Sequence, residues 1–415
     1  MTKEKSTVPR LRFPGFTDAW KQRKLREVAE KISQKNLDRQ YVETFTNSAE
    51  FGIISQRDFF EKNISSLDNI SGYYIVSPDD FVYNPRISNL APVGPIKRNK
   101  LGRVGVMSPL YTIFRFSDIH LDFVEKYFDT TIWHRYMELN GDSGARSDRF
   151  AIKDSVFKGL PIPLPTLPEQ EAIGSFFSDL DQLITLHQRK LDDVKELKKA
   201  LLQKMFPKGN GNDFPELRFP EFTDAWKQRK FSDLAEVRRG LTYSPSAIRS
   251  HGVRVLRSSN INEDTFVFGE DDVFVDKSVV KIPLVEEGDI LITSANGSSR
   301  LVGKHSIIKG LPSNSAIHGG FMLLASSKVP CFLNAFMSST WYHKFIGLYV
   351  AGGNGAIGNL NKSDLDEQIV LVPSLPEQEA IGSFFSDLDQ LITLHQRQLD
   401  HLKLLKKALL QQMFI

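Results

Sequence analysis

The amino-acid sequence predicts an α+β fold in which two globular, β-rich domains are separated by a long antiparallel two-helix coiled coil. Residues 167–206 and 375–414 agree at 35 of 40 positions, so the chain is a tandem duplication with an expected pseudo-two-fold axis. Within this repeat, apolar residues recur at the spacing of a coiled coil. The segments before each copy, 31–166 and 237–374, share little identity and contain short apolar runs typical of strands.

A second repeated segment opens each half, because residues 11–24 and 217–230 differ only at Gly15 and Glu221. The two repeats together predict five parts of the chain. These are a first domain (1–166), a first repeated helix (167–206), a Gly- and Asn-rich linker (207–215), a second domain (216–374) and a second repeated helix (375–415).

Composition restricts the class of protein. The chain has 415 residues, 41% of them hydrophobic, which exceeds one ordinary core and favours several folded domains. The single cysteine, Cys331, excludes an intramolecular disulfide and a cysteine-based metal cluster. The charged N-terminal residues lack the apolar stretch of a secretory signal, and no apolar run is long enough to span a bilayer. We therefore expect a cytoplasmic protein, whose net charge of +3 permits DNA binding without requiring it.

The repeated segments are predicted to be helices of about 58 Å. Each begins with the pattern of a capping box, Thr166 with Glu169 and Ser374 with Glu377. Eight of ten seam positions in each copy are apolar, and such a seam needs a partner helix, which is the other copy. The seams are Ile173, Phe177, Leu180, Ile184, His187, Leu191, Val194, Lys198, Leu201 and Met205, then Ile381, Phe385, Leu388, Ile392, His395, Leu399, Leu402, Lys406, Leu409 and Met413.

Two histidines, His187 and His395, interrupt these seams near their middles. They either fix the register of pairing, as buried polar residues do in other coiled coils, or are tolerated residues that pack beside the seam. Neither has the neighbouring carboxylates or thiols of a metal site.

Short apolar runs bounded by turn residues predict strands in both divergent segments. Asp79-Asp80 and the apolar run after it align with Gly288-Asp289 and the run that follows, which indicates one fold with two different surfaces. The predicted strands occupy 80–84, 104–107 and 110–116 in the first domain and 252–256, 288–293 and 320–325 in the second.

Both repeated helices open on one motif, Pro165-Thr-Leu-Pro-Glu-Gln-Glu-Ala-Ile173 and Pro373-Ser-Leu-Pro-Glu-Gln-Glu-Ala-Ile381. It resembles the Pro-Leu-x-Glu-Gln-x-x-Ile motif of the DNA-specificity subunit of type I restriction–modification enzymes. The segment from Phe13 to Trp20, repeated from Phe219 to Trp226, resembles the family's lead-in. Parts of the divergent segments resemble its recognition domains, namely Gly240-Leu-Thr-Tyr243, Asn260-Ile261, Gly288-Asp289 and Ser108-Pro-Leu-Tyr111.

This resemblance implies a subunit without its own catalytic site or cofactor. Its two target-recognition domains would each read one half of a bipartite, asymmetric target in double-stranded DNA. The helices would set the spacing of the half-sites and dock two methyltransferase (modification) subunits. Restriction/translocase subunits would complete the complex, with S-adenosylmethionine, ATP and Mg required by those partners, in a bacterial or archaeal cytoplasm.

Loops rich in Gly, Asn, Ser and Arg are the candidates for DNA contact, because these side chains hydrogen-bond to bases or phosphates. The alternative is that these loops are ordinary solvated turns. The candidates are Lys97, Arg98, Asn99, Lys100, Arg103, Arg146, Ser147 and Arg149 in the first domain, and Arg257, Ser259, Asn260, Ser294, Asn296, Ser298, Arg300, Asn354 and Asn359 in the second.

The repeated helices are the candidates for pairing and partner binding. Identity at positions expected to face solvent, such as Glu169 and Gln170, reflects either a shared docking surface or recent duplication. The candidates are Glu169, Gln170, Ile173, Phe177, Leu180 and Ile184 with Glu377, Gln378, Ile381, Phe385, Leu388 and Ile392.

No catalytic motif is found. Gly297–His305 has one residue too many between its glycines for a phosphate loop, and Asn84-Pro85-Arg86 lacks the second proline and aromatic residue of an adenine methyltransferase. A fused modification enzyme is therefore disfavoured. The remaining alternative is a coiled-coil scaffold whose two end domains bind proteins and make no contact with DNA.

Overall fold

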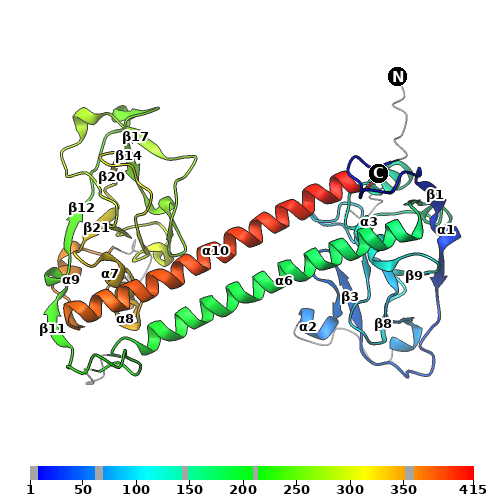
Figure 1. Ribbon diagram of the computed structural model, residues 1–415, viewed down its shortest axis with the longest axis horizontal. Helices are drawn as coiled ribbons and strands as arrows, with labels where there is room; N and C mark the ends of the chain where they lie inside the picture. Colours follow the sequence, from blue (N-terminus) through cyan, green and yellow to red (C-terminus); the bar gives the residue numbers. More distant parts are fainter. Residues whose placement is uncertain (1–7, 61–68, 143–147, 209–213, 351–358) are drawn as a thin grey trace. The chain divides into compact units, whose positions relative to one another are not determined.

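The computed structural model describes residues 8–60, 69–142, 148–208, 214–350 and 359–415 (Figure 1). The chain forms two compact units. The first contains Met1–His187 together with Gln398–Ile415, and the second contains Gln188–Arg397. Each unit thus combines one divergent domain with parts of both long helices.

The first unit runs from the repeated lead-in into the first long helix, and the end of α10 (Leu375–Met413) also belongs to it. Its elements are β1 (Lys21–Lys24), α1 (Leu25–Val28), β2 (Ala29–Ile32), β3 (Phe45–Ser48), β4 (Gly52–Ser55), α2 (Gln56–Phe60), β5 (Tyr74–Val76), β6 (Phe81–Tyr83), β7 (Ile96–Arg98), β8 (Gly105–Met107), β9 (Thr112–Phe116), α3 (Leu121–Phe128), α4 (His134–Asn140), α5 (Asp154–Phe157), β10 (Pro161–Leu164) and the start of α6 (Leu167–Lys204).

The second unit begins and ends in the same way, and its described middle part contains more strands and no α-helix in place of α1 or α2. Its elements are the end of α6, then β11 (Lys227–Lys230), β12 (Glu236–Arg239), β13 (Ile248–Arg249), β14 (Val253–Leu256), β15 (Ile261–Asn262), β16 (Thr265–Phe266), β17 (Val273–Val275), β18 (Ile290–Thr293), β19 (His305–Ile307), β20 (Ala316–His318), β21 (Met322–Ser326), α7 (Pro330–Met337), α8 (Thr340–Val350), α9 (Lys362–Asp366), β22 (Ile369–Val372) and the start of α10 (Leu375–Met413).

Both divergent domains are built on the same four-stranded antiparallel sheet. Its strand order is β2-β9-β6-β7 in the first unit and β12-β21-β18-β19 in the second. The six predicted strands are confirmed as β6, β8, β9, β14, β18 and β21, each slightly shorter than the apolar run that predicted it. The prediction of one fold with two surfaces is therefore correct for this sheet.

The turns that precede β6 and β18 explain why Asp79-Asp80 aligns with Gly288-Asp289 in otherwise unlike sequences. Asp79 and Gly288 both adopt positive φ, at 69° and 92°. The following carboxylate closes each turn, because Asp80 accepts a hydrogen bond from Ser77 N at 2.7 Å and Asp289 accepts one from Glu286 N at 3.0 Å. Two unlike sequences thus place an aspartate at the same point of the sheet.

The two long helices pair in antiparallel fashion. In the first unit, Ile173 and Phe177 near the start of α6 share a core with Leu410 and Phe414 near the end of α10. In the second unit, the end of α6 shares a core with the start of α10, through residues such as Phe206 and Phe385. The predicted antiparallel coiled coil is confirmed, and its seam continues into the core of each domain.

Each core is closed by the last aromatic residue of a helix repeat. Phe414 packs its ring against Trp20, Phe123 and Phe177, with centroids 5.3–6.2 Å apart. The second unit has Phe206 in the matching place, in contact with Trp226, Phe332, Phe336 and Phe385 at 5.8–6.2 Å. The repeat therefore supplies the first part of a helix to one core and its end to the other.

A glycine on each long helix allows the divergent domain to pack closely. A Cβ at Gly174 would lie 2.9 Å from the backbone nitrogen of Phe123, and one at Gly382 would lie 2.6 Å from that of Phe332. Helices α3 and α7 approach the long helices at these points, so a side chain at either glycine would force them apart.

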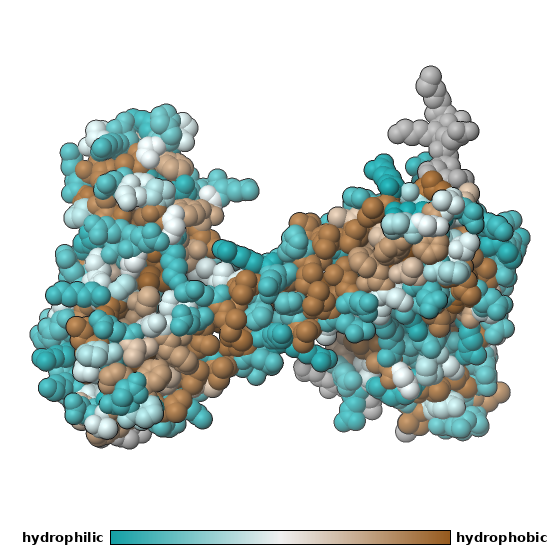
Figure 2. Space-filling view, viewed as in Figure 1, coloured by the Kyte–Doolittle hydropathy of each residue, from teal (hydrophilic) through white to brown (hydrophobic). Residues whose placement is uncertain are grey.

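Beyond the first residue of each long helix, Leu167 and Leu375, seven further leucines are exposed on these helices, and Figure 2 shows apolar side chains at the surface of the helical segments. They are Leu183, Leu186 and Leu197 on α6 with Leu391, Leu394, Leu404 and Leu405 on α10. Among the described residues, neither these helices nor any other is long and apolar enough to cross a membrane.

Candidate nucleic-acid interface

Described residues from three predicted loops of the second unit meet beside the end of β18. The loop after β18 is joined to the segment after β14 by a hydrogen bond from Asn296 Nδ2 to Ser258 Oγ at 3.1 Å. It is joined to the segment before α9 because Leu360 N donates to Ser294 O at 2.7 Å, beside a β-bridge between Ala295 and Asn359. We call this surface the second loop edge.

Close backbone contacts bring a fourth segment to the second loop edge. A Cβ at Gly240 would lie 1.9 Å from the carbonyl oxygen of Gly319, and one at Gly320 would lie 2.4 Å from Thr242 Oγ1. Only glycine fits at these positions, so the segment that begins at Gly240 is fixed beside the turn between β20 and β21.

The first unit has an equivalent surface, the first loop edge. Phe150 N donates to Pro85 O at 2.7 Å, beside a β-bridge between Arg86 and Arg149. Asn84 Nδ2 donates to Asn47 O at 2.8 Å and so joins the segment after β6 to β3. The two loop edges therefore share backbone connections but present different side chains.

Several candidates belong to the loop edges, and three cannot be placed. Arg149 contributes to the first loop edge, and Asn296 and Asn359 contribute hydrogen-bonding side chains to the second. Ser294 is buried at its base, while Ser259, Ser298 and Arg300 lie in the adjoining turns. Arg146, Ser147 and Asn354 lie outside the described residues.

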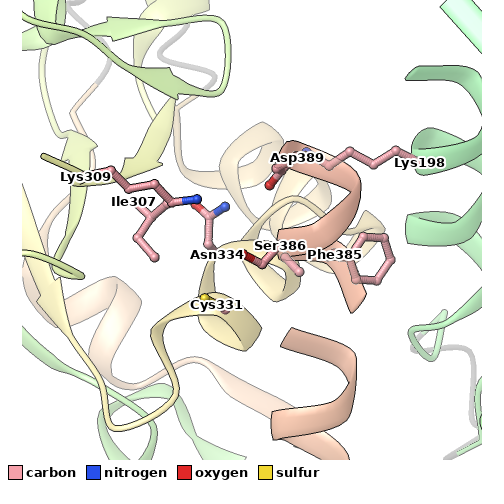
Figure 3. A pocket seen from close by; sticks show the side chains of 9 residues that line it. Lys198, Ile307, Lys309, Cys331, Asn334, Phe385, Ser386 and Asp389 are labelled. Carbon is pink, nitrogen blue, oxygen red and sulfur yellow. Dashed lines mark ion pairs between the residues drawn. The ribbon is translucent and has the colours of Figure 1, made fainter. Parts of the chain in front are cut away.

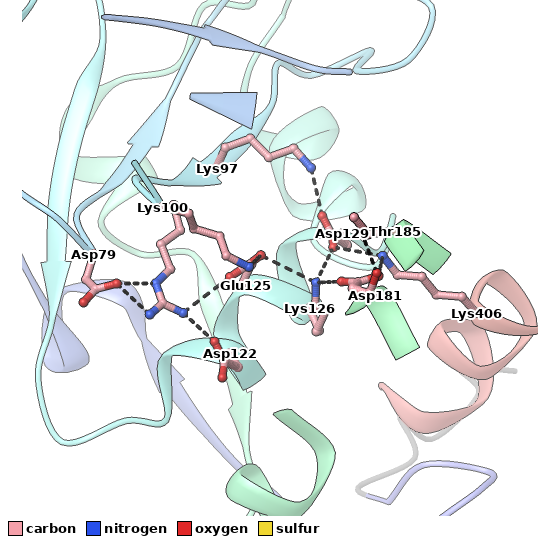
Figure 4. A network of polar contacts seen from close by, with 11 residues as sticks. Asp79, Lys97, Lys100, Asp122, Glu125, Lys126, Asp129, Asp181, Thr185 and Lys406 are labelled. Carbon is pink, nitrogen blue, oxygen red and sulfur yellow. Dashed lines mark hydrogen bonds and ion pairs between the residues drawn. The ribbon is translucent and has the colours of Figure 1, made fainter. Parts of the chain in front are cut away.

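Other candidates are held by contacts inside the protein. Basic side chains of the predicted loop 97–103 pair with acidic residues, and three of these, Asp122, Glu125 and Asp129, lie on or next to α3 (Figure 4). The donors are Lys97 to Asp129, Arg98 to Asp79 and Asp122, Lys100 to Glu125, and Arg103 to Glu43, at 2.6–3.0 Å, while buried Asn99 donates to the carbonyls of Ser77 and Arg103. Contact of this loop with DNA stays a prediction.

Contacts inside the protein also hold two candidates of the second unit, Asn260 and Arg257. Asn260 is buried, and its Nδ2 donates to Asp272 Oδ1 at 2.7 Å while its Oδ1 accepts from Arg257 N. The guanidinium of Arg257 donates to the carbonyl oxygen of Asp271 at 2.7 Å. These internal hydrogen bonds fix the shape of the loop. A contact with a base would therefore have to use the exposed atoms of the loop.

Burial of Glu169 and Gln170 corrects the expectation that they face solvent. Glu169 is fully buried, and its carboxylate accepts hydrogen bonds from Arg12 Nε and Nη2 at 2.6 and 2.7 Å and from Trp20 Nε1 at 3.4 Å. Gln170 accepts from His120 N and donates to Pro165 O. The carboxylate predicted to cap the helix thus anchors the lead-in segment.

The second repeat makes matching contacts. Arg218 donates to both carboxylate oxygens of Glu377 at 2.7 Å, Trp226 Nε1 lies 3.3 Å from the same group, and Gln378 Nε2 donates to Pro373 O. These positions therefore make the same internal contacts in both repeats. The predicted pairing positions Ile173, Phe177, Leu180, Ile381 and Phe385 are buried, while Ile184, Leu388 and Ile392 are partly buried.

A charged cluster at the junction of α3 with the long helices distinguishes the first unit (Figure 4). Lys126 is almost fully buried and lies within 4 Å of Glu125, Asp129 and Asp181, while Lys406 of α10 bonds Asp181 at 2.7 Å. Burial alone would lower the pKa of Lys126, but the three carboxylates outweigh it and raise that pKa. The cluster keeps its charges and ties the domain to both helices.

The second unit keeps only the helix-to-helix part of this arrangement. Lys198 bonds Asp389 at 2.6 Å, and Ala335 occupies the place of Lys126. A small pocket is left there, lined by Cys331, Asn334 and Lys309 among others (Figure 3). Within the described ranges, no group of three or more His, Cys, Asp or Glu side chains is placed to hold a metal ion.

The cluster makes the first unit sensitive to acid. Burial favours the neutral form of Asp129, but Lys97, Lys126 and Lys406 lower its pKa to about 2 from an ordinary 3.8. Because the pKa is lower in the folded state, the stabilisation is complete above about pH 4 and is lost as the pH falls towards 2. The difference corresponds to about 2 kcal/mol.

We therefore expect Asp129→Asn to destabilise the first unit at pH 5 and to flatten its loss of stability between pH 5 and pH 3. Hydrogen exchange of the α3 amides at both pH values measures this. Asp179→Asn, at an exposed carboxylate on α6, is the matched control. The interpretation is wrong if Asp129→Asn and the wild type lose equal stability over this range.

Two copies of one α+β domain with unlike loop edges, joined by antiparallel helices, define a duplicated protein with two different loop surfaces. The family described as type I restriction modification DNA specificity domain matches residues 17–196 and again residues 223–404. These matches cover most of the chain, which therefore belongs to this family.

Curated relatives are distant. The chain is 22% identical over 270 residues to the type I restriction enzyme MjaVIII specificity subunit of Methanocaldococcus jannaschii, over 62% of each chain. It is 26% identical over 238 residues to the EcoKI specificity subunit of Escherichia coli K12, over 55% of this chain and 51% of that one. The chain thus covers less than two thirds of the length of these relatives.

Solved structures share the fold along the whole chain. The S subunit of a type I restriction-modification system from M. genitalium superposes with a TM-score of 0.61 at 14% identity, covering 98% of this chain and 99% of that one. A chain from a study of assembly and conformational transition in a type I R-M system gives 0.52 at 13% identity, covering 95% and 97%.

Proposed function

We propose that this protein is the DNA-reading subunit of a type I restriction–modification complex, without a catalytic site of its own. Each loop edge reads one half of a bipartite target in double-stranded DNA. The observation that carries this proposal is the pair of loop edges, which share backbone connections but present different side chains. The chain that forms them belongs to a family of DNA specificity domains. Two different surfaces on one framework suit an asymmetric target.

The paired helices hold the two reading domains and dock the partner subunits. Support comes from exposed leucines at matching positions of the repeat, Leu183 with Leu391 and Leu186 with Leu394. Exposed apolar side chains that recur in both copies suit one kind of partner bound twice. We infer that the partners are two methyltransferase subunits, joined by restriction/translocase subunits, in the cytoplasm of a bacterium or archaeon. S-adenosylmethionine, ATP and Mg act in those partners.

Mapping of methylated adenines across the genome, with and without this gene, tests the proposal. We expect a bipartite motif to lose methylation when the gene is deleted and to regain it when the gene is restored. Partner docking is tested separately, with a gene in which Leu183 and Leu391 are both changed to Ser. Co-purification with this variant measures whether the partner subunits still bind. If no motif depends on the gene, the chain does not direct methylation.

Exchange of one domain tests the division of labour. When residues 31–166 are replaced by the corresponding segment of a related chain, we expect one half of the methylated motif to change and the other half and the spacing to persist. The reason is that the second loop edge and the helices are untouched. Changes in both halves would show that the two domains do not read independently.

A further inference from the structure

Each loop edge presents one exposed apolar side chain at the third position of a tight turn. In the second unit, Met322 N donates to Gly319 O at 2.9 Å, and Phe321 between them is 73% exposed. In the first unit, Tyr111 N donates to Ser108 O at 3.0 Å, and Leu110 is 56% exposed. The exposure of most of a phenylalanine side chain in a turn calls for a reason, because burial of such a ring is energetically favourable.

Sheet register shows that these two residues are equivalent. Phe81 directly follows Asp80 and pairs with Phe114, while Ile290 directly follows Asp289 and pairs with Ala325. Four residues before Phe114 is Leu110, and four residues before Ala325 is Phe321. The same point of the framework therefore carries a large apolar side chain in both units.

Neighbouring hydrogen bonds fix Phe321 within the second loop edge. Its carbonyl oxygen accepts from Ser294 N at 2.9 Å and from Ala295 N at 3.2 Å. Asn296 and Thr242 lie on the segments that contact this turn, so polar side chains stand on the segments next to it. In the first unit, Tyr111 next to Leu110 shares a hydrogen bond with Thr46 at 3.1 Å. The backbone is held in place while the side chain points into solvent.

We propose that Phe321 and Leu110 make apolar contacts with the bases of the two DNA half-sites, and that each helps to set the specificity of its domain. This inference rests on the proposed function. Apolar side chains on DNA-binding surfaces contact thymine methyl groups or enter between base steps, and aromatic rings stack on bases. The surrounding amide and hydroxyl groups supply the hydrogen bonds that an apolar contact lacks.

The difference between the two residues favours DNA over a protein partner. A partner that docks on both halves would meet the same residue twice, as it does at the matching leucines of the long helices. Leu110 and Phe321 occupy equivalent places but differ in size and shape, and both lie in the divergent segments. That pattern suits two half-sites of different sequence.

Phe321→Ala and Leu110→Ala, each in the full chain assembled with its partner subunits, test the inference. The DNA probe is a duplex that carries the methylated motif found by genome mapping. We expect Phe321→Ala to bind it roughly 5- to 150-fold more weakly, the effect of removing an aromatic side chain stacked on a base. Leu110→Ala removes a smaller apolar contact and should weaken binding to a lesser extent. Phe321→Ala should relax base preference in one half of the motif, and Leu110→Ala in the other.

Two exposed leucines on helices provide matched controls. Leu348→Ala in α8 and Leu139→Ala in α4 remove side chains that are 80% and 72% exposed, and neither should change binding. Unchanged binding and motif for Phe321→Ala would overturn the inference while methylation of the wild-type motif still supports the proposed function. Loss of a partner subunit from the Phe321→Ala complex would also overturn it, because the contact would then be with protein. Absence of any gene-dependent motif would instead reject the proposed function.

Discussion

Glu169→Ala is expected to lower the free energy of unfolding of the first unit by about 3–5 kcal/mol, the cost of breaking a buried ion pair. The carboxylate of Glu169 is fully buried and is the only acceptor described for Arg12 Nε and for the indole N–H of Trp20. Its removal leaves the buried indole N–H without an acceptor, and the partly exposed Arg12 keeps only the carbonyl oxygen of Asp18.

The duplication provides an internal replicate of this experiment. Glu377→Ala removes the same contacts with Arg218 and Trp226 and should destabilise the second unit by a similar amount. Hydrogen exchange resolved by segment reports each unit separately. Each variant should therefore raise exchange in its own unit and leave the slowest amides of the other unchanged.

Two further variants decide whether the unpaired charge is the cause. Arg12→Met combined with Glu169→Met replaces the ion pair by apolar groups and should recover much of the lost stability. Glu27→Ala removes an exposed ion pair with Arg23 and should have little effect. If the double variant is as unstable as Glu169→Ala, packing of the lead-in segment and not charge burial accounts for the loss.

Local and repeated features of the fold could be predicted from the sequence. The heptad seam predicted the long helices, since burial of positions such as Phe177 and Phe385 follows from periodicity alone. Short apolar runs predicted the central strands for the same reason. Glu169 was misread because a buried carboxylate has no periodic signature. The available signal was that Arg12 and Glu169, 157 residues apart, recur together as Arg218 and Glu377.

The candidate site was less predictable because it depends on contacts between distant segments. Convergence of the loops relies on the Asn296–Ser258 hydrogen bond and on the bridge at Asn359, neither of which leaves a local pattern. The basic loop 97–103 was chosen by its charge, but α3 supplies the opposing carboxylates. Phe321 has no signature of a DNA contact in the sequence, because it lies in the apolar run 320–325, which is typical of a core strand.

Phe414→Ala is expected to destabilise the first unit by roughly 3–5 kcal/mol, the range for removing a buried aromatic side chain. Although it is the second-last residue, Phe414 is buried and contacts the rings of Trp20, Phe123 and Phe177. The backbone of the adjoining helix end is also fixed, since Leu11 N donates to Gln412 O at 3.0 Å. The end of α10 is therefore part of the core of the first domain.

Phe206→Ala should have the same effect on the second unit, where Leu217 N donates to Lys204 O at 2.9 Å in the matching position. Segment-resolved hydrogen exchange is again the measurement, with faster exchange expected in α3 for Phe414→Ala and in α7 for Phe206→Ala. Leu404→Ala, at a residue of α10 that is 67% exposed, is the control and should change stability by less than about 0.5 kcal/mol. Equal exchange in α3 for Phe414→Ala and the wild type would mean that the helix end does not close this core, and that the first unit is stable without the second repeat.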